Sequence, residues 1–179
     1  ILYSFVFKRI VVLDVITLAG LYTMRIIAGA VVIGAYPTFW LLAFSMFIFL
    51  SLALVKRYSE LKVVQIASLK SNNQRPVHGR SYEIGDMPVL QSIGSESGLI
   101  AVLIFAFYIN SPEIKILYEV PEILWLALPI LLYWISRMWL LTIRGLMHQD
   151  PVVFAMTDKV SIVSGIVMAI LLLLATIMT

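Results

Sequence analysis

Apolar residues gather in five segments of this chain, each long enough with its flanks to cross a bilayer as a helix. Residues 38–55, for example, contain no charged side chain. The hydrocarbon core of a bilayer is about 30 Å thick, and a helix of roughly 20 apolar residues spans it. The pattern therefore predicts membrane helices at about residues 10–35, 38–62, 89–110, 121–143 and 159–178.

The composition leads to the same class of protein. Hydrophobic residues make up 61% of the chain, charged residues only 13%, and the mean hydropathy is +1.00. Soluble domains carry about 25% charged residues, so this composition excludes a soluble globular fold. The chain has no cysteine, which excludes a disulfide framework. We predict an all-α, polytopic bundle of membrane helices.

Basic residues separate sharply between the two sets of loops that alternating helices create. Lys115 alone lies on one side, and ten lie on the other: Lys8, Arg9, Lys56, Arg57, Lys62, Lys70, Arg75, Arg80, Arg144 and Lys159. By the positive-inside rule the richer side, with loops 63–88 and 144–158, faces the cytoplasm of an inner membrane, and the C-terminus lies outside. The net charge of +3 thus indicates topology and not nucleic-acid binding.

The chain opens at Ile1 without a methionine, on a short apolar stub that ends at Lys8. We interpret residues 1–179 as the C-terminal part of a single transmembrane domain, with about five full helices after the stub. We do not expect this part to turn over a substrate alone.

Charged residues close the apolar run at its cytoplasmic end. Lys56 and Glu60 are four residues apart, and Arg57 and Glu60 are three apart, so these side chains can cluster on one helix surface. Two cations beside a carboxylate would suit a phosphorylated substrate and its Mg²⁺. Spacing alone also allows a belt of interfacial anchors, and by itself favours that interpretation.

The first predicted helix carries two charges. Asp14 and Arg25 share one face of it, since eleven residues complete close to three turns. Arg25 lies near mid-membrane, where an unpaired charge is expensive, so it faces the bundle interior, a water-filled cavity or a carboxylate of another helix. Asp14 is a candidate for binding near a phosphate or metal, or a charge that favours the helix N-terminus.

Polar groups also gather in both long cytoplasmic loops. The first contains His78, Arg80 and Tyr82, and it is either a lid over a site or a solvated connection. The second contains Arg144 and Asp150 below a membrane helix, and Arg137 lies two turns above Arg144 on the same helix face. This strip is a candidate anion site.

Several segments together resemble a known family. They are Leu13-Asp14-Val15, residues 18–23 and 25–30, Ser51 to Leu61 (SLALVKRYSEL), Gly79-Arg80-Ser81-Tyr82, Leu132 to Arg137 (LYWISR) and Asp150 to Ala155 (DPVVFA). In this order they resemble the UbiA superfamily of intramembrane prenyltransferases, and within it the decaprenyl-phosphate phosphoribosyltransferase branch.

The resemblance implies a bundle of nine membrane helices, of which this chain supplies the tail of the fourth and the fifth to ninth. It implies a diphosphate bound through Mg²⁺, which two acidic motifs hold on the cytoplasmic side. The first motif is not in this chain. At the second, where relatives that use prenyl diphosphates carry aspartates, this sequence has Lys56, Arg57, Tyr58 and Glu60. The departure suits a donor with more anionic groups, such as phosphoribosyl diphosphate.

The implied reaction moves 5-phosphoribose from phosphoribosyl diphosphate to a polyprenyl (decaprenyl) phosphate, releases diphosphate and serves envelope glycan synthesis. The resemblance assigns donor phosphates to Lys56, Arg57 and Arg80, the metal or ribose hydroxyls to Glu60, positioning to Tyr58 and Tyr82, and the ribose or metal shell to Asp14. It places Arg137, Arg144 and Asp150 near the acceptor phosphate, with Asp150 also a candidate metal ligand. Gln149 stands where relatives carry an acid, which weakens any metal role of that loop.

Two alternatives remain open from the sequence. One is a conventional UbiA enzyme that transfers a prenyl chain from a prenyl diphosphate to an aromatic or haem acceptor. The other is a transporter or scaffold, in which Arg25 and Arg137 line a solute path.

Overall fold

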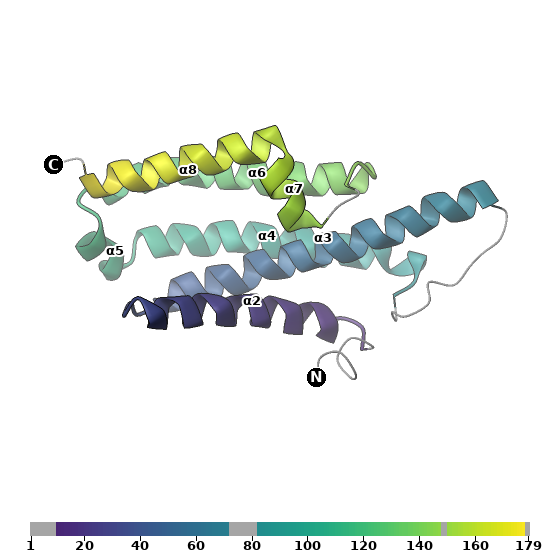
Figure 1. The fold of residues 1–179 in the computed structure, drawn as a ribbon, viewed down its shortest axis with the longest axis horizontal. Coiled ribbons are helices and arrows are strands. Elements are labelled where there is room, and N and C mark those ends of the chain that lie inside the picture. The colour runs from purple at the N-terminus through teal and green to yellow at the C-terminus, as the bar shows by residue number, and fades with distance from the viewer. Residues whose placement is uncertain (1–9, 72–81, 148–149, 178–179) are drawn as a thin grey trace.

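The computed structural model describes residues 10–71, 82–147 and 150–177 of the chain, and all of their regular structure is helical. Five long helices account for most of it (Figure 1). In order, the elements are α2 (Leu13–Val32), α3 (Phe39–Ser71), η2 (Ile84–Asp86), α4 (Met87–Ile109), α5 (Pro112–Leu117), η3 (Pro121–Leu126), α6 (Ala127–Ile143), α7 (Pro151–Thr157) and α8 (Lys159–Ile177).

Five helical segments are long and apolar enough to cross a membrane: Leu13–Val32, Phe39–Ser68, Ile84–Ile109, Pro121–Ile143 and Lys159–Ile177. The expected all-α membrane fold is thereby confirmed. Successive long helices run in alternate directions, so the starts of α2, α4 and α8 and the ends of α3 and α6 lie toward one end of the bundle (Figure 1). We call this the polar end, because the charged clusters described below lie there.

Two of the predicted loops contain helix. The helix expected to end at residue 62 continues to Ser71, because residues 63–71 contain neither glycine nor proline and keep a helical alternation of apolar and polar residues. The second predicted loop, residues 144–158, contains α7. Asp150 accepts a hydrogen bond from the Val152 amide at 3.0 Å and Pro151 occupies the first turn, which are standard signals for a helix start.

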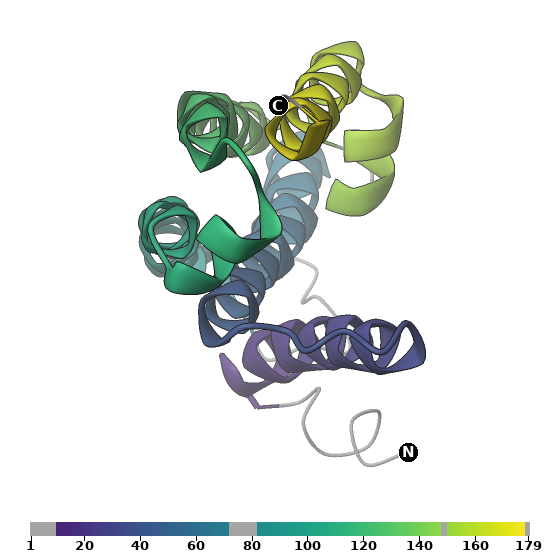
Figure 2. The same cartoon turned by 90° about the vertical axis from the view of Figure 1, so that its left-hand side faces the viewer.

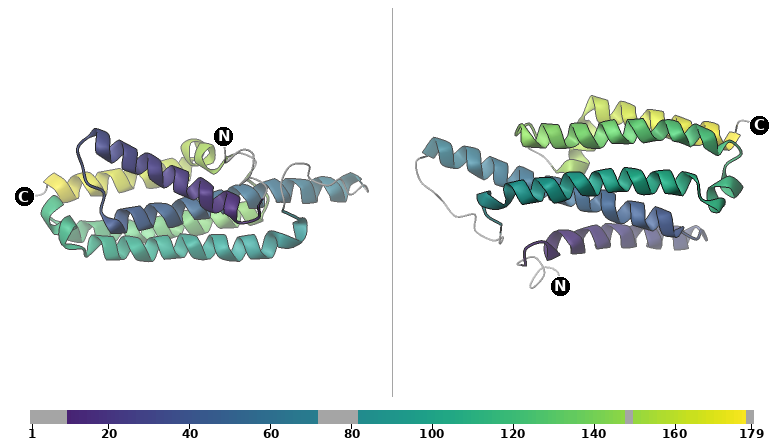
Figure 3. Two further views of the ribbon diagram at one scale, coloured as in Figure 1. Left: turned by 90° about the horizontal axis from the view of Figure 1, so that it is seen from below. Right: turned by 180° about the vertical axis from the view of Figure 1, so that it is seen from behind.

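Helix α3 is the centre of the bundle. It packs against α2 on one side and against α4, α6 and α7 on others, and its longest interface is with α4 (Figure 2). Helices α6 and α8 form a further layer above it, seen from two more directions in Figure 3. The two outermost helices, α2 and α8, leave most of their surface exposed, with only 11% and 17% of their most apolar stretch buried.

Small residues allow α3, α4 and α6 to approach closely. A Cβ added to Gly94 would lie 2.2 Å from Trp139 Cζ2, and one added to Gly98 would lie 2.6 Å from Ile135 Cγ2. Ser51 of α3 donates to the Gly94 carbonyl at 2.7 Å and accepts from Trp139 Nε1 at 3.0 Å. One serine thus joins three membrane helices, as small and hydroxyl residues commonly do inside a bilayer.

Candidate functional site

Asp14 is the centre of a buried polar cluster at the polar end. Its side chain is 1% exposed and lies in the first turn of α2. Oδ2 accepts from Arg57 Nε of α3 at 2.7 Å, and Oδ1 accepts from the Tyr82 hydroxyl, just before η2, at 2.6 Å. Both carboxylate oxygens are therefore satisfied, which a buried charge requires. We name Asp14, Arg57, Glu60 and Tyr82 the α2–α3 cluster.

Tyr82 connects this cluster to the start of α2. Its hydroxyl accepts from the Val12 amide at 2.7 Å while it donates to Asp14. Burial and the hydrogen bond to Asp14 raise the pKa of Tyr82, so it stays protonated. Val12 has a φ of 68°, a left-handed conformation that a β-branched residue adopts only under strain. Tyr82 therefore helps to hold a strained turn at the entrance of α2.

Arg57 lies between two carboxylates. It is 4% exposed, and its Nη1 donates to Glu60 Oε2 at 3.0 Å in addition to the bond from Nε to Asp14. Glu60 is 37% exposed, so Arg57 links a buried carboxylate, that of Asp14, to one near the surface. The enclosed guanidinium holds α2 against α3 and is less accessible to a phosphate than the sequence alone suggested.

Lys56 turns away from the α2–α3 cluster. Consecutive helical residues point about 100° apart, and the Lys56 ammonium forms an ion pair with Asp150 Oδ2 at the start of α7. We expected Lys56, Arg57 and Glu60 to cluster on one helix surface. Arg57 and Glu60 do so, whereas Lys56 pairs with Asp150. Both members of the Lys56–Asp150 pair are about one-third exposed, 36% and 33%.

Asp150 is fully engaged by its neighbours. Partial burial alone would raise the pKa of its carboxyl, but the hydrogen bonds from Lys56 and the Val152 amide, with the charge of Lys56, outweigh burial and lower that pKa.

Tyr58, the next residue of α3 after Arg57, faces a third direction and packs edge-on against Trp139 with ring centroids 6.1 Å apart. Its 5% exposure places it in the core between α3 and α6, away from both ion pairs.

Arg137 forms a separate pair at the start of α8. It donates from Nη1 and Nη2 to the two oxygens of Asp158, at 2.6 and 3.0 Å. Asp158 also accepts from the amide and hydroxyl of Ser161, both at 2.9 Å. The Arg137 bonds, ahead of the opposing effect of burial, lower the pKa of Asp158. Sequence reasoning missed Asp158, although an aspartate three residues before Ser161 at a helix start is a capping signal.

Arg144 is exposed at the end of α6. The turn that follows packs on the extension of α3, since a Cβ added to Gly145 would lie 3.4 Å from Ile66 Cδ1 and 3.5 Å from Lys62 Cγ. Gly145 itself has a φ of 72°, which ends the helix in the left-handed region. The predicted site residue Arg80, and also His78 and Gln149, lie outside the described residues.

The described residues do not provide a magnesium site of their own. Among residues 10–71, 82–147 and 150–177, no three His, Cys, Asp or Glu side chains come together as a ligand set. Of the predicted ligands, Glu60 is paired with Arg57, and both oxygens of Asp150 are occupied by Lys56 and the Val152 amide. The Mg²⁺ expected from the UbiA resemblance depended mainly on an acidic motif outside this chain, and it stays a prediction.

Comparisons with known proteins place this chain beside two bacterial relatives. It is 36% identical over 168 residues to the uncharacterized protein y4nM of Sinorhizobium fredii, and the matched region covers 93% of this chain and 32% of that protein. It is 32% identical over 155 residues to the nodulation protein NoeC of Azorhizobium caulinodans, and the matched region covers 85% of this chain and 48% of that protein. No family model and no solved structure matches. The chain is thus similar to about a third of one curated relative and about half of the other.

Proposed function

We propose that this chain is part of a membrane transferase of the UbiA type, which moves 5-phosphoribose from phosphoribosyl diphosphate to a polyprenyl phosphate. Support comes from the five membrane helices and from the resemblance of residues 51–61 to the superfamily segment in which relatives carry the second acidic motif. The proposal includes a polar end that faces the cytoplasm of an inner membrane and a product used for envelope glycans.

The observation that carries the proposal is the placement of Lys56. It is a cation at the polar end of a membrane helix, it is one-third exposed, and its partner Asp150 begins the short helix α7. Ion pairs between partly exposed groups are weak, commonly below about 1 kcal/mol, so a polyphosphate can replace the carboxylate at modest cost. A donor phosphate at this position would gain a charge-assisted hydrogen bond.

The other residues take supporting roles in this proposal. Arg57 is enclosed by Asp14 and Glu60 and keeps α2 and α3 in register beside the donor site, while Tyr82 holds the entrance of α2. Arg144, exposed in the turn next to Lys62, is free to approach an acceptor or donor phosphate. No step is assigned to Mg²⁺, because the described residues do not form a site for it.

The chemical step is a substitution at the anomeric carbon of the donor. An oxygen of the polyprenyl phosphate forms the new bond to this carbon, and the bond from the carbon to the diphosphate breaks. The diphosphate departs with the electron pair. A phosphate anion needs no strong base to act as a nucleophile, so the protein's contribution is to position the two substrates and to stabilise negative charge on the leaving group.

The decisive experiment uses the complete polypeptide in membranes with radiolabelled phosphoribosyl diphosphate and decaprenyl phosphate. The proposal expects label in the lipid fraction and release of diphosphate. A parallel reaction with a labelled prenyl diphosphate and an aromatic acceptor tests the conventional prenyltransferase alternative. Label that enters only the aromatic product would overturn the phosphoribosyl assignment.

A second candidate function is a non-enzymatic membrane scaffold or transporter. One observation favours it: Lys56, Arg57 and Arg137 are each already paired with a carboxylate, as expected of residues that hold helices together. The same assay distinguishes this candidate, which expects label in neither product. The name of NoeC states a process, nodulation, and no reaction.

A further inference from the structure

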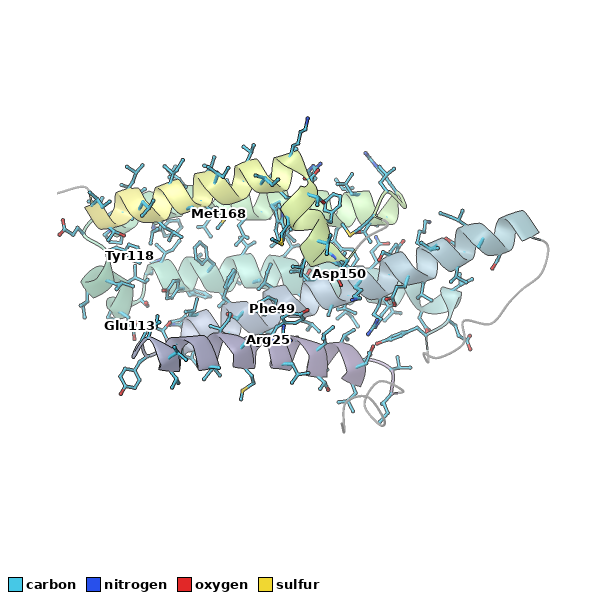
Figure 4. The ribbon with its side chains drawn as sticks, in the orientation of Figure 1. Arg25, Phe49, Glu113, Tyr118, Asp150 and Met168 are labelled. Carbon is cyan, nitrogen blue, oxygen red and sulfur yellow. The ribbon has the colours of Figure 1, made fainter. Side chains whose placement is uncertain are left out.

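Arg25 is a charged residue on the open side of α2. Three residues at helical spacing from it are also exposed, Leu21 at 46%, Val32 at 85%, and Ala28, whereas Asp14, eleven residues earlier on the same stripe, is buried. We call Leu21, Arg25, Ala28 and Val32 the Arg25 face. Figure 4 shows Arg25 on α2 near Phe49 of α3. The Arg25 guanidinium lies over the Tyr22 ring, 4.9 Å from its centroid, and that ring stacks on Phe49.

The depth of Arg25 makes its exposure unusual. Helix α2 runs from Leu13 to Val32 and is about 30 Å long at 1.5 Å per residue, so it matches the thickness of a bilayer core. Arg25 lies about 18 Å from the start of the helix by the same rise. Its guanidinium lies over Tyr22, one turn back toward the middle of α2 and away from the nearer end at Val32. Arg25 therefore does not reach the closer interface.

Within the described ranges, the nearby contacts do not neutralise this charge. The contact with Tyr22 is a cation–π interaction, which leaves the positive charge in place. The carboxylate of α2 itself, Asp14, is occupied by Arg57 and Tyr82. Glu96 lies at a comparable depth in α4, but it accepts from Ser92 of its own helix, and α4 packs on a different side of α3 (Figure 2).

We propose that the Arg25 face is a docking surface for a further transmembrane helix of the same polypeptide, which presents an aspartate or glutamate at the level of Arg25. Charge complementarity favours this occupant, because an unpaired cation in the bilayer core is costly, lipid tails offer it no partner, and a carboxylate neutralises it. Length supplies the second argument, since the relatives contain two to three times the sequence matched here, 48% and 32% of their chains being covered.

The surface around Arg25 suits a closely packed helix. Ala28 and Gly29 are exposed one turn beyond Arg25, and a Cβ added to Gly29 would meet nothing within 4 Å. Small residues beside the charge let another backbone approach, so that a short aspartate side chain can reach the guanidinium. This inference does not depend on the proposed transfer reaction, because it concerns assembly of the helices and not the polar end.

The test uses the complete polypeptide in native membranes, with other cysteines replaced. Ala28→Cys, which keeps Arg25, is treated with a membrane-impermeant thiol reagent, and Tyr36→Cys in the exposed α2–α3 turn is the labelled control. We expect loss of labelling at position 28 relative to position 36. A cysteine placed beside a mid-span Asp or Glu of the remaining sequence should form an intramolecular disulfide with Ala28→Cys.

Stability measurements provide the second readout. Arg25→Leu should lower the melting temperature. Arg25→Lys, which keeps the charge, should lower it less, and Met24→Leu at the neighbouring exposed position should leave it unchanged. The proposal is overturned if Ala28→Cys is labelled as readily as Tyr36→Cys, which indicates a water-filled cavity. Disulfide-linked dimers in place of the intramolecular bond, or remaining helices without a mid-span acid, would also overturn it.

Discussion

Lys56 and Arg57 are consecutive residues of α3, yet they bind carboxylates on different helices. Lys56 pairs with Asp150 at the start of α7, and Arg57 pairs with Asp14 in the first turn of α2. The turn of about 100° between neighbouring helical positions produces this divergence. The two pairs also differ in burial, since Arg57 and Asp14 are 4% and 1% exposed whereas Lys56 and Asp150 are about one-third exposed. The buried pair is suited to structure and the exposed pair to exchange with a ligand.

The first prediction concerns the buried pair. Asp14→Ala should lower the free energy of unfolding by about 3–5 kcal/mol, because it removes one partner of a buried ion pair. Thermal unfolding in detergent, followed by tryptophan fluorescence, measures the effect. Asp86→Ala is the matched control, since Asp86 accepts the Glu83 amide at an exposed helix start and should cost only about 1 kcal/mol.

The double variant Asp14→Leu with Arg57→Leu separates pairing from simple loss of packing. Replacing both members removes both buried charges, and Glu60, which loses its bond from Arg57, is 37% exposed to solvent, so this variant should be more stable than Asp14→Ala. If the double variant is no more stable than Asp14→Ala, the pair stabilises the protein by its geometry and not by charge balance.

The second prediction concerns the exposed pair. Lys56→Ala should change the free energy of unfolding by less than about 1 kcal/mol, as expected of a partly exposed ion pair. Under the proposed function it should nevertheless raise the KM for phosphoribosyl diphosphate by about tenfold or more, the worth of one charge-assisted hydrogen bond. Lys62→Ala, on the same helix and hydrogen-bonded to Gln65, is the control and should leave KM near the wild-type value. An unchanged KM in Lys56→Ala would remove Lys56 from the donor site.

The third prediction is a pH dependence at Asp158. Its carboxyl pKa is lowered from 3.8 in the folded protein, chiefly by Arg137, so the folded state binds this proton less readily than the unfolded state. The associated stability is therefore fully present above pH 3.8 and is lost as the pH falls through the lowered pKa. Melting temperatures measured from pH 7 downward should fall more steeply for the wild type than for Asp158→Asn below about pH 4. Parallel curves would contradict this assignment.

The sequence alone predicted most of the fold but only part of the contacts. Apolar length identified five spans, because a bilayer imposes a minimum helix length. The link between Asp14 and Arg57 could not be predicted, since it joins two helices 43 residues apart and depends on how they rotate about their axes. Helix α7 was missed although Asp150 and Pro151 form a capping signal. Charges near a membrane end were interpreted as ligands for a substrate, whereas several of them pair with one another.

The fourth prediction tests the close packing of α3, α4 and α6. Gly94→Ala would place a Cβ 2.2 Å from Trp139 Cζ2 and 2.9 Å from Leu54 Cβ, so the indole must shift and its hydrogen bond to Ser51 must weaken. We expect a loss of about 1–3 kcal/mol, typical of an overpacked core. Gly165→Ala is the control, because nothing lies within 4 Å of a Cβ there and alanine favours a helix by up to about 1 kcal/mol. Both variants add one methyl group to a membrane helix, so opposite shifts in melting temperature isolate the effect of the contact. Equal shifts would mean that α4 does not approach Trp139 as closely as described.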